Sequence, residues 1–367
     1  MRVLVTGSNG FIGKNLIIRL NELDIQVSTY TRESSTQNLE ELIKDTDFVV
    51  HLAGENRPKD DKDFDVVNTG LTMSICNALR SLGENTPIIL ASSTQAEFDN
   101  AYGKSKLNAE ASVKMLEVDT GCPVYVYRLP GVFGKWCKPN YNSVVATFCY
   151  NISHDIPIQI NDPSLELSLV YIDDVIEEFV RAIQGLRNGK KELSVQPKYK
   201  IKLGDLSTQI QNFKKSRDSL ITEKVGSGLI RKLYSTYLSY LSPEQFSYLI
   251  PSYGDERGMF AEMLKTKDSG QFSFFTAGPG VTRGGHYHHS KTEKFLVVQG
   301  RVKFGFRNVA TDETHEIITT SKELKIVETM PGWSHDITNI GSEEIIVMLW
   351  ANEIFHPDNP DTITHKV

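Results

Sequence analysis

The first half of the chain alternates short apolar runs with amphipathic helical patterns. Helical patterns cover residues 11–23 and 66–83, and the β-branched apolar runs lie at residues 2–7, 25–31, 48–54, 87–93 and 124–134. A strand followed by a helix, repeated along a chain, implies crossover connections between strands. The pattern therefore predicts an α/β domain whose parallel sheet is covered by helices on both faces.

From about residue 255 the pattern changes to strands without helices between them. Gly, Asn, Asp and Ser turns separate the apolar runs at residues 272–278, 294–300, 301–306, 315–320, 324–329 and 344–351. Short strands joined by such turns are typical of an all-β sandwich or barrel. We therefore predict an all-β domain at this end of the chain.

The length supports a division into two domains. At 367 residues the chain is too long for one ordinary core, since domains usually have roughly 100 to 200 residues. The stretch from residue 214 to 245 is mixed and partly helical. We therefore predict an α/β domain over residues 1–245 and an all-β domain over residues 246–367.

Charge and cysteine use exclude several classes of partner. Lys+Arg 40 against Asp+Glu 46 gives a formal charge of −6, which provides no basic field for a polynucleotide. The four cysteines lie in the first half without a CxxC pair, as expected in a reducing compartment. No stretch approaches the roughly 18 apolar residues of a membrane helix. We expect a cytoplasmic protein that binds neither nucleic acid nor membrane.

Three glycines after the first apolar run predict a dinucleotide site. Gly7, Gly10 and Gly13 follow a strand and open a helical pattern, so that a pyrophosphate can approach the unpaired amides of the helix N-terminus. The second strand ends at Thr31 and Arg32 without an acidic residue at its tip. Because an acid there binds ribose hydroxyls and an arginine accommodates a 2′-phosphate, the pattern favours NADPH.

Tyr102 and Lys106 are the catalytic candidates. They open a helical pattern in the segment AYGKSK, and Thr94 precedes them at the end of an apolar strand. A free tyrosine has a pKa of about 10, and a neighbouring ammonium lowers this pKa by stabilising the phenolate. The pair therefore predicts a proton donor or acceptor. A second YxxxK match, Tyr287 to Lys291, lies inside another motif and is interpreted as accidental.

Histidines near the C-terminus predict a metal site. His286 and His288 are two residues apart, so on a strand they project from the same face. The turn that follows is expected to return Glu293 on a neighbouring strand, and His335 supplies a fourth ligand. Imidazole and carboxylate ligands suit zinc, iron, manganese or nickel. We predict one divalent ion and take zinc as the first choice.

The first domain resembles the extended short-chain dehydrogenase/reductase family, whose domains have a Rossmann fold. The motifs TGxxGxxG, DFVVHLAGEN, VVNTG, LASST, YGKSK, RLPGVFG and VYIDDV occur in the family's order over about residues 1–240. The resemblance implies a catalytic triad of Thr94, Tyr102 and Lys106, supported by Asn68. Tyr102 follows Thr94 by only eight positions, where the family has a longer loop, which implies an open substrate pocket. The implied cofactor site comprises Gly7, Asn9, Gly10, Phe11, Ile12, Gly13, Arg32, Leu52, Ala53, Asn68, Tyr102 and Lys106.

The second domain resembles the cupin family over roughly residues 255–367. The string Gx5HxHx4Ex6G, followed by GxxHx3N, matches that family. Pro331 directly precedes Gly332, where the family has a residue between them. The resemblance implies an all-β barrel with the metal ligands His286, His288, Glu293 and His335.

A reductase domain followed by a cupin resembles bifunctional enzymes of bacterial capsular-polysaccharide synthesis on the route to UDP-N-acetyl-L-fucosamine. The resemblance implies that the cupin epimerises carbon 3 of a UDP-4-keto-6-deoxy-hexosamine. The first domain would then reduce the 4-keto group with NADPH to give UDP-2-acetamido-2,6-dideoxy-L-talose. The substrate is thus a UDP-sugar, and a homodimer is expected.

Two other functions stay open at this point. A nucleotide-sugar 4-epimerase or dehydratase with a cupin appendage would retain NAD and regenerate it at each turnover. A non-catalytic sensor would bind NADP in one domain and a sugar in the other, although the intact Thr94, Tyr102 and Lys106 argue against it. Consumption of NADPH at each turnover separates the reductase from both alternatives.

Overall fold

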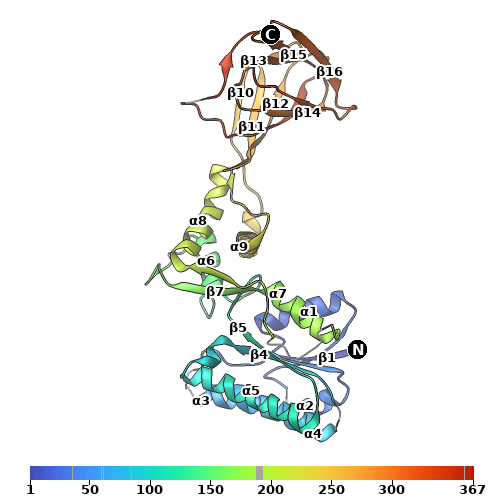
Figure 1. Cartoon of the computed structure of the whole chain (residues 1–367), viewed down its shortest axis with the longest axis vertical. Coiled ribbons are helices and arrows are strands. Elements are labelled where there is room, and N and C mark those ends of the chain that lie inside the picture. The colour runs from blue at the N-terminus through green and yellow to red at the C-terminus, as the bar shows by residue number, and fades with distance from the viewer. Residues whose placement is uncertain (35, 59, 61, 84, 187–192, 359) are drawn as a thin grey trace. The chain divides into compact units, whose positions relative to one another are not determined.

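The computed structural model describes residues 1–34, 36–58, 60, 62–83, 85–186, 193–358 and 360–367 (Figure 1). The chain divides into two compact units, one formed by residues 1–210 and 231–241 and the other by residues 211–230 and 242–367. The last division lies between residues 241 and 242. The sequence did not indicate that residues 211–230 belong with the second unit.

A five-stranded parallel sheet forms the centre of the first unit. Its strands lie in the order β2-β1-β3-β4-β5. Their bounds are β1 (Arg2–Thr6), β2 (Gln26–Tyr30), β3 (Phe48–His51), β4 (Ile88–Ser93) and β5 (Val124–Leu129). The order reverses between β1 and β3, and open α/β sheets bind ligands beyond the carboxyl ends of the strands at such a switch point. The predicted parallel sheet is confirmed.

Alternate residues of the strands face two helical layers. In β1, Val3 and Val5 pack on the face covered by α1 (Phe11–Glu22) and α7 (Ile172–Ile183), whereas Leu4 packs on the other face. That second face is covered by α2 (Thr36–Lys44), α4 (Leu71–Leu82) and α5 (Ala101–Thr120). Because successive side chains of a strand point to opposite faces, the continuous apolar run of β1 fits a sheet that is buried on both sides.

A small three-stranded sheet follows the parallel sheet. It contains β6 (Gly131–Phe133), β7 (Glu166–Tyr171) and β8 (Tyr199–Lys202) in that order. The apolar run at residues 124–134 is therefore two strands, divided at Pro130, whose nitrogen cannot donate to a ladder. The other elements of this unit are α3 (Lys62–Phe64), the π-helical segment η1 (Asp65–Gly70), the 3-10 segment η2 (Thr94–Glu97) and α6 (Val144–Ser153). Helix α9 (Gly228–Leu238) begins in the second unit and ends in the first. Helix α8 (Leu203–Ser219) begins in the first unit and ends in the second.

Two sheets around one apolar core form the second unit. One sheet has the order β10-β11-β12-β19-β14-β17 with β9 beside β11, and the other has the order β16-β15-β18-β13-β20. Their bounds are β9 (Ile221–Thr222), β10 (Ser252–Asp255), β11 (Gly258–Thr266), β12 (Gly270–Ala277), β13 (Thr282–Tyr287), β14 (Glu293–Gln299), β15 (Arg301–Asn308), β16 (Thr314–Thr320), β17 (Ile326–Glu328), β18 (Trp333–Asn339), β19 (Ile345–Ala351) and β20 (Ile363–Thr364). The 3-10 segment η3 (Pro243–Gln245) precedes β10. Phe275 and Val347 of the first sheet meet Phe304 and Ile337 of the second in the core. The predicted β-rich domain is confirmed. Among the described residues, no helix has the length and apolar content that a membrane span requires.

Candidate functional site

The glycine turn after β1 holds the chain close to the end of β3. Gly7 has a φ of +67°, and a Cβ there would lie 2.7 Å from the backbone nitrogen of Ala53. A Cβ on Gly13 would lie 2.4 Å from the carbonyl oxygen of Gly7. Gly10 precedes α1 and offers no side chain to cap it. The first amides of α1 are thereby left for a bound anion such as a pyrophosphate.

The other residues predicted in this turn occupy different environments. Asn9 is exposed, whereas Phe11 and Ile12 are half-buried and pack against the core of the parallel sheet. Of these three residues, only Asn9 presents its side chain freely to solvent. The packing of Phe11 and Ile12 against this core therefore fixes the position of the start of α1.

A neutral histidine links the ends of β1 and β3. The Thr6 hydroxyl accepts hydrogen bonds from the backbone N–H groups of Leu52 and Ala53, both at 3.2 Å, and donates to Nδ1 of His51 at 2.7 Å. The Thr72 hydroxyl donates to the carbonyl one turn earlier in its helix, so it accepts from Nε2–H of His51 at 2.9 Å. Burial lowers the pKa of His51 to about 3. His51 is therefore a structural bridge beneath the predicted cofactor residues Leu52 and Ala53.

Tyr102 and Lys106 lie one turn apart on α5. The Nζ atom of Lys106 is 5.9 Å from the centre of the Tyr102 ring and donates to the carbonyl oxygen of Ala91 at 3.3 Å. Only 7% of Lys106 is exposed. Burial lowers the pKa of its ammonium to about 8, against the opposing charge of Glu110. The ammonium is thus protonated at neutral pH and lies where it can stabilise negative charge near Tyr102.

Asn68 connects the end of β3 to α5. Its Oδ1 accepts from the backbone N–H of Glu55 at 2.8 Å, and its Nδ2 donates to the hydroxyl of Ser105 at 2.9 Å. A Cβ on Gly54 would lie 3.0 Å from Asn68 Oδ1 and 3.1 Å from Lys106 Nζ. Asn68 belongs to the π-helical segment η1, a rare local geometry that is common at functional sites. The structure therefore brings Asn68 and Lys106 together.

Two hydroxyls stand at the end of β4. Thr94 begins η2 and is half-buried. Burial raises the pKa of Tyr102, and a hydrogen bond with the Ser93 side chain opposes that rise. Of the two hydroxyls, that of Ser93 therefore contacts Tyr102. Sequence reasoning selected only Thr94, although Ser92 and Ser93 directly before it also offer hydroxyls; that of Ser92 donates to Glu110 at 2.6 Å instead.

Arg32 has a carboxylate partner that the sequence did not indicate. Its Nη2 lies 2.6 Å from Oε2 of Glu55, and the side chain of Arg32 is 80% exposed whereas that of Glu55 is 14% exposed. Burial raises the pKa of Glu55, but hydrogen bonds from the Arg57 backbone and Arg32 outweigh it, so the net pKa is lowered. A 2′-phosphate that binds Arg32 has to compete with the ionised Glu55.

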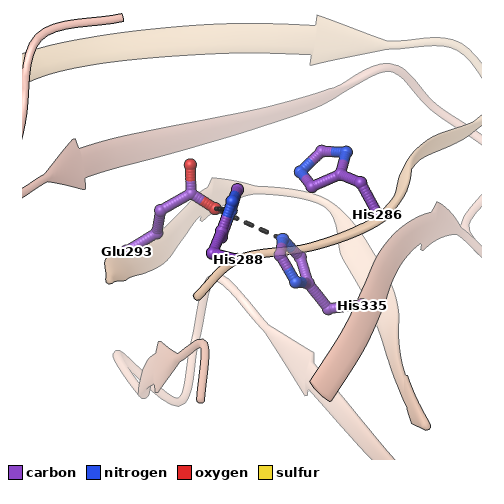
Figure 2. A group of neighbouring side chains, drawn as sticks. All are labelled: His286, His288, Glu293 and His335. Carbon is purple, nitrogen blue, oxygen red and sulfur yellow. Dashed lines mark hydrogen bonds and ion pairs between the residues drawn. The ribbon is translucent and has the colours of Figure 1, made fainter. Parts of the chain in front are cut away.

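The four predicted metal ligands gather in the second unit. Figure 2 shows the imidazoles of His286, His288 and His335 beside the carboxylate of Glu293. One possible ligand atom from each of these residues lies within 4.8 Å of all the others. His288 is 1% exposed, His335 2% and Glu293 5%. Burial lowers the pKa of His286 to about 4, so this imidazole is neutral and able to bind a metal.

Glu293 reaches this cluster from the opposite sheet. His286 on β13 pairs with His335 on β18 in one sheet. Glu293 is the first residue of β14, which pairs with β19 and β17 in the other sheet. The expectation that Glu293 returns on a neighbouring strand is therefore wrong. The turn after His288 passes from one sheet to the other, so the predicted ligands converge across the interior between the two sheets.

The hydrogen bonds of the cluster fit a metal ion. Nδ1 of His288 donates to the carbonyl oxygen of Asp361 at 2.5 Å, so neutral His288 carries its lone pair on Nε2. That atom faces Oε2 of Glu293 at 3.3 Å. The other oxygen of this carboxylate, Oε1, lies 3.0 Å from Nζ of Lys291. A cation between an imidazole lone pair and a carboxylate would turn this repulsive contact into shared coordination.

The C-terminal segment completes the surroundings of this cluster, and sequence reasoning missed it. The Asp361 carboxylate accepts from the backbone N–H groups of His289, Ser290 and Lys291 at 2.9, 2.7 and 2.8 Å. Strand β20 pairs with His286 and Tyr287 of β13. No local pattern signals these contacts, since they join positions about 70 residues apart.

The chain matches known proteins in both units. A family model described as the NAD dependent epimerase/dehydratase family matches residues 3–196. A model of the polysaccharide biosynthesis C-terminal domain matches residues 253–363. A UDP-2-acetamido-2,6-beta-L-arabino-hexul-4-ose reductase from Pseudomonas aeruginosa PA103 is 57% identical over 368 residues, which cover 100% of this chain and 99% of that protein.

Solved structures are also similar to this chain. The capsular polysaccharide assembling protein CapF from Staphylococcus aureus has a TM-score of 0.92 and 41% identity, covering 100% of both chains. A UDP-glucuronic acid 4-epimerase from Bacillus cereus has a TM-score of 0.56 and 19% identity over 65% of this chain and 98% of its own, which supports the fold alone. On these matches, the chain is an enzyme that belongs to the NAD dependent epimerase/dehydratase family.

Proposed function

We propose that the first unit reduces the 4-keto group of a UDP-4-keto-6-deoxy-hexosamine with NADPH. The product is UDP-2-acetamido-2,6-dideoxy-L-talose, on the route to UDP-N-acetyl-L-fucosamine and capsular polysaccharide. One observation carries this proposal. Lys106 lies close to both Tyr102 and Asn68, near the segment after β3 that the glycine turn contacts. The name of the Pseudomonas reductase supports the substrate class.

The chemistry assigns one task to each residue. The residues of the glycine turn would hold NADPH, which would supply the hydride for reduction at carbon 4 of the ketone. Tyr102 donates its proton to the new alkoxide, and the Lys106 ammonium stabilises the phenolate that remains. A hydroxyl at Thr94 or Ser93 orients the carbonyl, while Asn68 holds the segment after β3 against α5.

We further propose that the second unit is a cupin-type barrel that epimerises carbon 3 before the reduction. His286, His288, Glu293 and His335 would hold one divalent ion, with zinc as the first choice. Such an ion polarises a carbonyl and makes the adjacent C–H more acidic. The converging side chains of Figure 2, of which all but His286 are buried, support the proposal. We also propose that the protein is a cytoplasmic homodimer and that its two functions divide at residue 245.

One experiment tests the proposed function. The protein is incubated with UDP-4-keto-6-deoxy-hexosamines and NADPH, and the products are identified by NMR while NADPH absorbance is followed. We expect one NADPH consumed for each product formed. A 4-epimerised or dehydrated product without NADPH consumption would favour an enzyme that retains NAD. Binding of both ligands without any product would favour a sensor.

Arg32→Asp should shift the cofactor preference from NADPH toward NADH. The change removes the only proposed contact to the 2′-phosphate and places a second carboxylate near Glu55, so we expect kcat/KM with NADPH to fall by about 10- to 100-fold. The measurement compares both cofactors at a saturating ketone concentration. Arg32→Gln, which removes the charge without adding an acid, should lose NADPH efficiency without gaining NADH efficiency. Equal use of both cofactors by the unmodified enzyme contradicts the role of Arg32.

Asp361→Ala should weaken zinc binding by about 10- to 100-fold, the usual effect of losing a group that orients a metal ligand. The carboxylate holds three successive backbone N–H groups next to His288, and the same residue's carbonyl fixes the His288 tautomer. Affinity is measured by competition with a chelating dye. The exposed Asp358 provides the matched control, and equal affinity in both variants contradicts the prediction.

A further inference from the structure

Arg283 directs its side chain into the interior of the second unit. On β13 it pairs with Ile337 of β18, whose side chain is in the core between the two sheets. The preceding pair, Thr282 and Thr338, forms a hydrogen bond on the exposed face. Because side chains alternate along a strand, Arg283 shares the inner face with Ile337.

The guanidinium of Arg283 lies against an apolar ring in this interior. Its central carbon is 5.3 Å from the centre of the Phe275 ring, which belongs to the opposite sheet. Only 17% of the Arg283 side chain is exposed. Its Nε atom is buried and has no hydrogen-bond partner among the residues that the structure describes. A buried donor without a partner is costly, which points to a ligand that supplies the acceptor.

The carboxylate nearest to this guanidinium is already engaged. Asp255 lies 4.0 Å from Nη2 of Arg283, and it binds Arg257 at 3.1 Å through Nε and at 2.5 Å through Nη2. One carboxylate therefore faces two guanidinium groups. Burial and the charge of Arg257 lower the pKa of Arg283, and Asp255 offsets them only in part. A local excess of positive charge remains.

The same inner face carries the metal-ligand cluster. His335 precedes Ile337 by two residues on β18 and pairs with His286 of β13. Two residues span about 7 Å along a strand. Arg283 and the four predicted ligands thus line one interior, and the Arg283 guanidinium lies about two residues along the strands from the cluster.

We propose that Arg283 binds the diphosphate of a nucleoside diphosphate sugar in the second unit and thereby places the sugar ring at the His286–His335 cluster. A guanidinium presents parallel donors that match two phosphate oxygens. The inference rests on the proposed epimerisation for the identity of the sugar, whereas the diphosphate contact is testable without it. Arg283 is in this view a substrate-binding residue distinct from the metal ligands.

The kinetic test uses the full-length, zinc-loaded protein with Arg283→Met and Arg283→Lys. Methionine retains the packing on Phe275 and removes the charge. Without NADPH, solvent deuterium incorporation at carbon 3 of the UDP-4-keto sugar should show a KM raised by about 10- to 100-fold in Arg283→Met, with a smaller change in kcat. Arg283→Lys should fall between this variant and the unmodified protein. Unchanged KM in Arg283→Met overturns the proposal.

A binding test separates this proposal from the proposed function. UDP should slow amide hydrogen exchange in β13 of the unmodified protein and of the exposed-residue control Arg301→Gln, but not in Arg283→Met with full zinc content. If UDP protects the amides of β13 in a protein that exchanges no deuterium at carbon 3, the anion site is supported and the proposed epimerisation is contradicted. Absence of protection by both UDP and UDP-N-acetylglucosamine in the unmodified protein overturns the anion site.

Discussion

Replacing Tyr102 with phenylalanine is expected to reduce NADPH-dependent ketone reduction by about 10²- to 10⁴-fold, the usual contribution of a positioned acid or base. The ring packs at 5.4 Å from the Phe64 ring, and phenylalanine retains that contact. Cofactor affinity should therefore stay close to that of the unmodified protein, while the transferable proton is lost. Stopped-flow NADPH oxidation with a supplied ketone gives the rate, and fluorescence titration gives the affinity.

Tyr125→Phe provides the control for this experiment. Tyr125 lies on β5 and stacks on Phe48 at 6.1 Å in the same unit. Its substitution removes a hydroxyl without touching α5, so reduction should proceed at the normal rate. Near-normal turnover in Tyr102→Phe would remove Tyr102 from the mechanism and leave the hydroxyls at the end of β4 as proton donors to be examined.

The sequence was sufficient to predict the elements that local periodicity encodes. The apolar run before Gly7 forms β1, and the helical pattern after it forms α1. The glycine positions were also predictable, because the close approach of Gly7 to Ala53 admits no Cβ. The strands after residue 255 appear as β12, β14 to β17 and β19. In each case the information lies within one element and its adjoining turn.

Features that depend on distant pairing were not predictable from the sequence. Glu293 lies across the interior from His286 because the strands that carry them, β14 and β13, belong to different sheets. The pairing of Arg32 with Glu55 joins the ends of two different strands, and Asp361 contacts the predicted metal ligand His288 across 73 positions of the sequence. A charged residue gives no periodic signal of its partner, so only the folded arrangement identifies these contacts.

His288→Ala is expected to abolish tight metal binding and to slow inversion at carbon 3 by about 10²- to 10⁴-fold, if the metal polarises the ketone. The substitution removes an imidazole whose Nε2 faces Glu293 and whose Nδ1 is held by Asp361. Metal content is measured by mass spectrometry, and inversion by entry of solvent deuterium at carbon 3 without NADPH. Removal of metal from the unmodified protein by a chelator should act in the same direction.

The reductase should be spared by the same substitution, because Tyr102 and His288 belong to different units of the chain. A ketone supplied in the already inverted form should be reduced at the normal rate by His288→Ala. His315→Ala, which alters an exposed histidine on β16, should retain metal and both activities. Deuterium exchange retained in a folded, metal-free His288→Ala protein would leave the metal a structural role. The base would then be an unligated group near the cluster, among which Lys291 is buried and lies 3.0 Å from Glu293.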